Sequence, residues 1–144
     1  MRDLGQKRAR AGQSLTELPI VLVLFLVVTF GIVDAGRVIF MYNTVSLAAR
    51  EGVRYAVVRG SASGHAATAD DVTAYVRSKT VGLPVDVTVS WCAPTLGCSS
   101  LPASPFNDPG SSVAVTVHSL FTPVTPFVPG PFNLNSASRM VISR

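Results

Sequence analysis

The chain has 144 residues and a mass of 15.2 kDa, enough for one small domain and a dedicated terminal segment. Apolar residues make up 48% and charged residues only 14%, which argues against an ordinary cytosolic enzyme, a disordered tail or a nucleic-acid binder. The net charge of +4 is concentrated in the first twelve residues, which carry +3. Because this basic segment precedes an apolar run, the charge indicates membrane orientation rather than binding to nucleic acid.

The apolar run spans residues 18–33, contains no charge, and is flanked by Glu17 and Asp34. As a helix it would be about 24 Å long, slightly short of a bilayer core, so we expect the membrane part to extend over about residues 15–36. This predicts a single-pass protein of the cytoplasmic membrane, with a cytoplasmic N-terminus and an extracytoplasmic C-terminal domain. Glu17 would cost about 2–3 kcal/mol there without a partner or water. It is expected either in the headgroup region or beside a cation.

The residues before the apolar run resemble the processing site of type IV prepilins. Residues 8–17 read RARAGQSLTE, a basic leader that ends in Gly and is followed by a Glu five positions later. The resemblance implies that a prepilin peptidase cuts between Gly12 and Gln13, which makes Glu17 the fifth mature residue. The new α-amine of one subunit and the Glu17 of a neighbour would then pair in an apolar filament core, where such a pair specifies register.

Two other interpretations of this segment stay open. It could be an uncleaved signal anchor. It could also be a secretory signal cut after Ala35, since residues 33–35 read VDA. Against the secretory signal, the apolar run is long for such a segment, Glu17 and Pro19 fit it poorly, and the helical pattern continues through the cut.

Beyond Arg37 the pattern becomes amphipathic, and one helix is expected from about Leu15 to Val58. Asp34 and Arg37, and likewise Glu51 and Arg54, are three residues apart and can interact along its surface. The predicted organisation is a leader at 1–12, a long helix at 13–59 and an exported domain at 60–144. The expected apolar side consists of Val38, Met41, Val45, Ala48 or Ala49, Val53 and Ala56.

Two further blocks resemble the TadE-like family of pilin-related proteins. Residues 31–37 read GIVDAGR and residues 48–56 read AAREGVRYA, and Val53 is the one departure from the family pattern in the second block. The resemblance implies that Asp34, Gly36 and Arg37 of the first block belong to the family's helix motif. In the second block it implies the same of Arg50, Glu51 and Arg54. The resemblance implies a minor pilin or pseudopilin of a tight-adherence (Tad, Flp-type) pilus, which would contact other pilin subunits and an inner-membrane assembly platform.

The exported segment predicts a small α+β domain. Thr68 and Asp71 form a capping-box pattern at the start of a short helix. Residues 85–91 and 113–117 alternate as strands, and residues 138–143 form a weaker third strand. A sheet of about three antiparallel strands on the long helix would give a pilin-like arrangement, since so small a domain needs the helix to complete its core.

Cys92 and Cys98 enclose five residues and are expected to form a disulfide in an exported domain. A reduced pair and a metal pair are the alternatives. A metal site has little support, because the chain has no second Cys pair and His65 and His118 are far apart in sequence.

No residue pattern predicts catalysis or a cofactor. Asp70 and Asp71 are better explained as helix-start charges than as an acid–base pair, and there is no phosphate-binding loop. The Pro-rich stretches at 94–112 and 122–131 are expected to be rigid connections. The alternative function is a signal-anchored envelope protein whose exported domain binds a ligand or partner through these loops.

Overall fold

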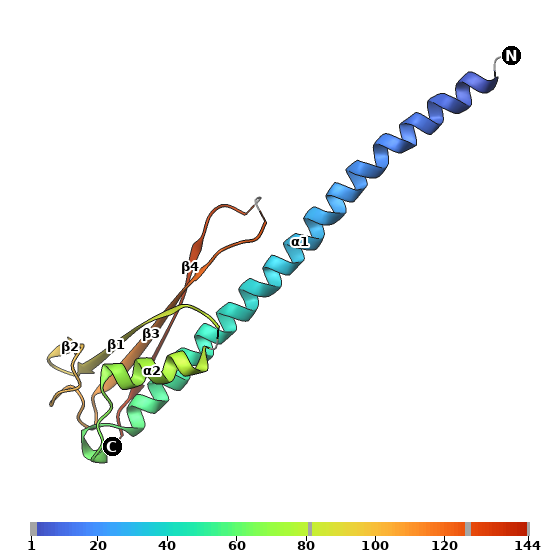
Figure 1. Cartoon of the computed structure of the whole chain (residues 1–144). Coiled ribbons are helices and arrows are strands. Elements are labelled where there is room, and N and C mark those ends of the chain that lie inside the picture. Colours follow the sequence, from blue (N-terminus) through green and yellow to red (C-terminus); the bar gives the residue numbers. More distant parts are fainter. Residues whose placement is uncertain (1–2, 81, 126–127, 144) are drawn as a thin grey trace. The chain divides into compact units, whose positions relative to one another are not determined.

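The structure, a computed structural model, describes residues 3–80, 82–125 and 128–143, and for residues 3–16 only the course of the backbone. The helices and strands are labelled in Figure 1. By its internal contacts the chain divides into two compact units. The first contains the N-terminal segment up to Arg37 together with Pro123–Pro129. The second contains Val38–Thr122 and the residues from Gly130 onward.

The long helix α1 runs from Asp3 to Val58 and continues through both sequence patterns. In its first part the side chains of residues 18–33 are exposed, apart from the half-buried Val27. In its second part the expected apolar side is buried, except that Val38 is only half-buried. The buried members are Met41, Val45, Ala48, Ala49, Val53 and Ala56.

Helix α2 (Ala69–Lys79) begins at the predicted capping box. The Asp71 backbone N–H donates to the Thr68 hydroxyl oxygen at 3.2 Å, and the Thr68 N–H donates to the Asp71 carboxylate at 3.0 Å. These bonds satisfy backbone donors that a helix start would leave without partners. A short 3-10 turn, η1 (Ser61–Ser63), precedes α2.

The sheet is antiparallel, with the strand order β2-β1-β3-β4. Its strands are β1 (Val85–Ala93), β2 (Gly97–Ser99), β3 (Ser112–Phe121) and β4 (Phe132–Val141). The expected α+β class is confirmed, with four strands instead of about three. β2 is too short to leave an alternating pattern, and β4 begins earlier than the predicted 138–143 and ends at Val141. The sequence pattern does not mark its start, because this edge strand is half-buried on one side and exposed on the other.

The core of the second unit lies between the sheet and both helices. At Gly52, α1 comes close to both other elements: a Cβ placed there would lie 2.5 Å from Val76 Cγ2 of α2 and 3.3 Å from Val115 Cγ1 of β3. Val76 and Val115 are fully buried and β-branched, so neither side chain can easily move aside. A side chain at position 52 would therefore force the helices and the sheet apart.

Cys92 and Cys98 are joined in a disulfide at the hairpin between β1 and β2. The two residues are direct cross-strand partners, which brings their sulfur atoms together. Arg139 of β4 donates from its Nη2 atom to the Cys92 sulfur at 3.4 Å. The disulfide thus links the two strands of the short β1–β2 hairpin, which the sequence pattern alone did not predict.

Candidate functional site: a buried carboxylate at the end of the apolar helix

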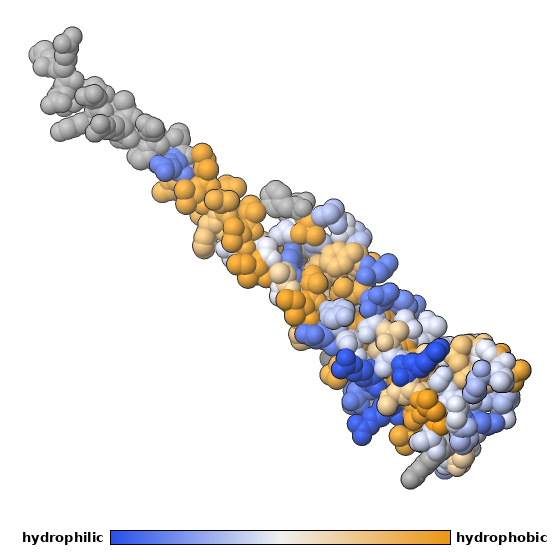
Figure 2. All heavy atoms as spheres, turned by 180° about the vertical axis from the view of Figure 1, so that it is seen from behind, coloured by the Kyte–Doolittle hydropathy of each residue, from blue (hydrophilic) through white to orange (hydrophobic). Residues whose placement is uncertain are grey.

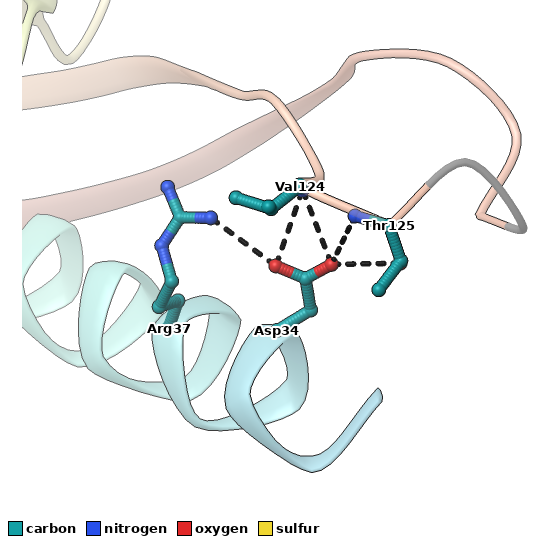
Figure 3. Close-up of polar contacts among 4 residues, drawn as sticks. All are labelled: Asp34, Arg37, Val124 and Thr125. Carbon is teal, nitrogen blue, oxygen red and sulfur yellow. Dashed lines mark hydrogen bonds and ion pairs between the residues drawn. The ribbon is translucent and has the colours of Figure 1, made fainter. Parts of the chain in front are cut away.

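Asp34 is a buried carboxylate that directly follows the exposed apolar segment of α1. It is only 4% exposed, whereas Val33 is 52% exposed. Its Oδ2 atom accepts hydrogen bonds from the backbone N–H groups of Val124 and Thr125, at 3.1 and 2.9 Å, and from the Thr125 hydroxyl at 2.7 Å (Figure 3). The carboxylate is therefore satisfied by a segment that lies about ninety residues later in the chain.

Arg37 completes the environment of this carboxylate. Its Nη1 atom lies 3.1 Å from Asp34 Oδ1, and the same Oδ1 atom accepts from the Val124 N–H at 3.2 Å. The Arg37 side chain is 45% exposed, so one side of the pair is open to solvent. Charge-assisted hydrogen bonds of this kind are the stronger ones in proteins, and they hold the segment after β3 against the helix.

The loop that reaches Asp34 has a sequence suited to presenting its backbone. Pro123 fixes its own φ angle and has no N–H, and the next two residues direct both of theirs to the carboxylate. Thr125 is buried, at 7% exposure, whereas Val124 is 68% exposed. The loop thus turns a polar backbone inward and an apolar side chain outward.

Glu17 lies at the other end of the apolar segment and is exposed. Within the described side chains it has no hydrogen-bond or ion-pair partner. A shallow depression on the helix surface is lined by Glu17, Leu18, Val21, Leu22 and Phe25. Glu17 is therefore a carboxylate on an apolar surface, open to a group from outside the chain.

Gly12 and Gln13 lie on α1, and their side-chain surroundings fall outside what the structure describes. The processing site thus stays a prediction from sequence. Gly36 is exposed, and a Cβ placed there would meet nothing within 4 Å. Among the described residues, nothing packs against the glycine at this position.

The residues of the second block lie on α1 within the second unit. Arg50 and Arg54 are exposed and Glu51 is half-buried. In the described part of the chain, Glu51 and Arg54 form no ion pair, in contrast to Asp34 and Arg37.

An aromatic contact instead joins the end of α1 to α2. The Tyr55 ring stacks on Tyr75 with centroids 4.3 Å apart, and the Arg59 guanidinium lies 3.9 Å from the Tyr55 centroid. This side of α1 is therefore held by stacking rather than by the expected second ion pair.

The sequence patterns do not mark Val124, Thr125 or Gly52 as important positions. The sequence does contain a signal that Asp34 is buried. Asp34 precedes Met41 by seven residues, and residues seven apart lie on the same side of a helix, which here is the buried side. Its partners left no comparable pattern. Among the described residues, no group of three or more His, Cys, Asp or Glu side chains is arranged to hold a metal ion.

Residues 12–54 match the family described as TadE-like protein. This part of the chain is TadE-like. The match confirms the resemblance inferred from the two blocks, and it indicates a protein related to Tad pili. Comparisons with curated proteins and with solved structures found no match.

The TadE-like segment covers most of the one helix in the described part of the chain that is long and apolar enough to cross a membrane, Glu17–Val58. Figure 2 shows apolar side chains along this part of α1, next to the hydrophilic position at its start. Length, composition and exposure together fit a single-pass membrane anchor. The match ends before α2 and the sheet, so the TadE-like character belongs to the helix.

Proposed function

We propose that this chain is a non-enzymatic minor pilin or pseudopilin that takes part in assembly of a Tad (Flp-type) pilus. In this proposal a prepilin peptidase cuts after Gly12. The mature protein is then anchored in the cytoplasmic membrane, with an extracytoplasmic C-terminal domain, before it assembles. The observation that carries the proposal is the TadE-like match, which spans Gly12, Glu17 and Arg54. The matched residues therefore include the proposed cleavage position and the carboxylate that would act after cleavage.

The assembly step depends on Glu17. Cleavage would give Gln13 a cationic α-amine, and Glu17 is exposed among apolar side chains with no described partner. An ion pair between Glu17 and the α-amine of a neighbouring subunit would neutralise both charges. Because an isolated charge in an apolar surrounding is costly, subunits in the wrong register would be disfavoured.

The exported part of α1 also offers a surface to other subunits. Ile39, Phe40 and Leu47 are 62%, 67% and 61% exposed, on the side of the helix away from the buried residues. Large exposed apolar side chains of this kind are typical of protein–protein contact surfaces. Contact with neighbouring pilins and an inner-membrane assembly platform would cover them.

Cleavage is tested by intact mass and N-terminal sequencing of the membrane-extracted protein, with and without the prepilin peptidase. The expected mature protein starts at Gln13 only when the peptidase is present. Gly12→Val should block cleavage, whereas Gly5→Val, a matched change within the leader, should not. A start at Met1 would indicate an uncleaved anchor, and a start at Gly36 would indicate a secreted domain; either result overturns the proposal.

The pairing step is tested with Glu17→Gln, which keeps the side-chain shape and removes its charge. This variant should be cleaved normally, yet its recovery in the sheared pilus fraction should fall strongly. Asp86→Asn, the same chemical change on an exposed strand position, should assemble like the unmodified chain. Normal assembly of the Glu17→Gln variant would refute the pairing mechanism.

A further inference from the structure

The loop between β3 and β4 has an unusual composition for an exported domain. Residues 122–133 contain no charged residue, and four of them are proline. In its described part, Val124 is 68% exposed and Val128 is 38% exposed. Two exposed aliphatic side chains on a loop without charges form an apolar surface, and such surfaces are typical of sites that contact another protein or a membrane.

The position of this loop is specified by Asp34. The carboxylate accepts both N–H groups of residues 124 and 125 and the Thr125 hydroxyl, all within 3.2 Å. Asp34 in turn is the first charged residue after the exposed run of residues 18–33. The hydrogen bonds therefore hold the loop beside α1 at the level where the apolar segment ends.

We propose that Val124 and Val128 of the β3–β4 loop contact the phospholipid headgroup region and form a second membrane contact beside the end of the transmembrane helix. This inference rests on the membrane anchoring assumed in the proposed function. The exposed Val124 and Val128 side chains contact lipid, and the backbone polar groups at 124 and 125 are satisfied by Asp34 rather than left to the bilayer. The loop sets how deeply the helix is inserted.

The charges around the loop agree with a lipid surface. The Asp34 carboxylate is bonded by backbone N–H groups, which lowers the cost of a charge at a membrane boundary. Arg37 lies one helical turn further, 45% exposed, at a position from which a guanidinium reaches phosphate groups. A protein neighbour would be the other occupant, but the loop offers it no charge for recognition.

The test uses full-length protein in phosphatidylcholine vesicles whose acyl chains are brominated near the headgroup, because bromine quenches nearby tryptophan. Val124→Trp places the reporter on the loop. Leu101→Trp is the matched control, since Leu101 is an equally exposed aliphatic loop residue, at 67% against 68%, in the other unit. Phe25→Trp, on the exposed apolar part of α1, reports on the membrane anchor itself.

The expected result is a loss of tryptophan emission, beyond that of the unmodified chain, for Val124→Trp and Phe25→Trp but not for Leu101→Trp. Adding Asp34→Ala to Val124→Trp should reduce this loss toward the Leu101→Trp level. Unchanged emission from the native Trp91, which is buried at 1% exposure, would verify that the domain stays folded.

Two outcomes would overturn the inference in distinguishable ways. If Phe25→Trp is quenched and Val124→Trp is not, the helix is anchored but the loop does not contact lipid. A blue-shifted, unquenched Val124→Trp would then identify a protein neighbour as the occupant. If Phe25→Trp is also unquenched, the membrane anchor itself fails, and the proposed function fails with it.

Discussion

The Thr125 hydroxyl donates a 2.7 Å hydrogen bond to Asp34 Oδ2, across ninety-one residues of sequence. This bond joins the end of the apolar helix segment to a loop that follows the third strand. Both residues are buried, and the neighbouring Val124 and Arg37 add further bonds to the same carboxylate. The aspartate in the first TadE-like block is thus a tether for the chain that returns from the sheet.

The first prediction concerns this tether. Thr125→Val keeps the side-chain shape and removes the hydroxyl, so the loop should open more often. The amide of residue 125 should exchange with solvent roughly fivefold faster, as expected for a lost hydrogen bond worth about 1 kcal/mol. Hydrogen exchange followed by mass spectrometry of the β3–β4 loop measures this change.

Asp34→Ala should have a larger effect on the same loop, because both backbone N–H groups lose their acceptor. Thr88→Val, at an exposed position of β1, is the matched control and should leave exchange of the loop unchanged. Equal exchange in the Thr125→Val and Thr88→Val proteins would contradict a tether at Asp34.

The second prediction concerns the close approach at Gly52. Gly52→Ala adds a methyl group 2.5 Å from Val76 Cγ2 and 3.3 Å from Val115 Cγ1. Overpacking of this kind costs about 1–3 kcal/mol, which outweighs the roughly 0.5–1 kcal/mol that alanine contributes in a helix interior. The thermal midpoint of the full-length protein in detergent, followed by circular dichroism, should therefore fall by several degrees.

Gly36→Ala provides the matched control for that measurement. A Cβ at position 36 meets nothing within 4 Å, so only the gain in helix propensity remains. The midpoint should stay constant or rise. A Gly52→Ala protein as stable as the Gly36→Ala protein would show that α1 does not approach α2 and β3 as closely as the structure describes.

The third prediction is a pH dependence at the start of α2. The Thr68 N–H and hydroxyl donate to Asp71 Oδ2 at 3.0 and 2.8 Å, and these bonds hold the pKa of Asp71 below its ordinary value. A carboxyl whose pKa is lower in the folded state stabilises the fold above its unfolded pKa of about 4. That contribution is lost as the pH falls through the folded pKa.

Asp71→Asn should therefore lower the thermal midpoint near neutral pH, and its difference from the unmodified chain should shrink below about pH 4. Asp70→Asn is the control, because Asp70 lies in the same first turn while the capping bonds to Thr68 come from Asp71. A difference that stays constant down to low pH would indicate that the ionised capping bond does not stabilise the helix.

The capping box shows why some elements are accessible from sequence. Thr68 and Asp71 act over three residues, so the pattern contains both partners of the interaction. The same holds for the apolar run 18–33 and for the buried side of α1, whose spacing follows from helix geometry. Strands β1 and β3 alternate clearly, because one of their sides is buried.

Strand β4 and the contact at Asp34 show the opposite case. β4 lies at the edge of the sheet, so its residues are half-covered on one side and exposed on the other, and the alternation of Asn and Ser gives little contrast. The three-residue spacing predicted that Asp34 and Arg37 can interact along the helix, and the structure contains this ion pair. The residues near Asp34 in the sequence did not indicate that Thr125 would form a hydrogen bond with its carboxylate.

By itself the sequence determined the basic N-terminal segment, the apolar helix segment, the TadE-like blocks and the capped second helix, because each is a pattern among residues a few positions apart. Only the tertiary structure decided that Asp34 binds the β3–β4 loop and that Gly52 must stay small. Their partners, Thr125 and Val115, are separated from them by more than sixty residues of sequence. Such contacts depend on where the chain returns after the sheet has formed, and local spacing does not encode that return.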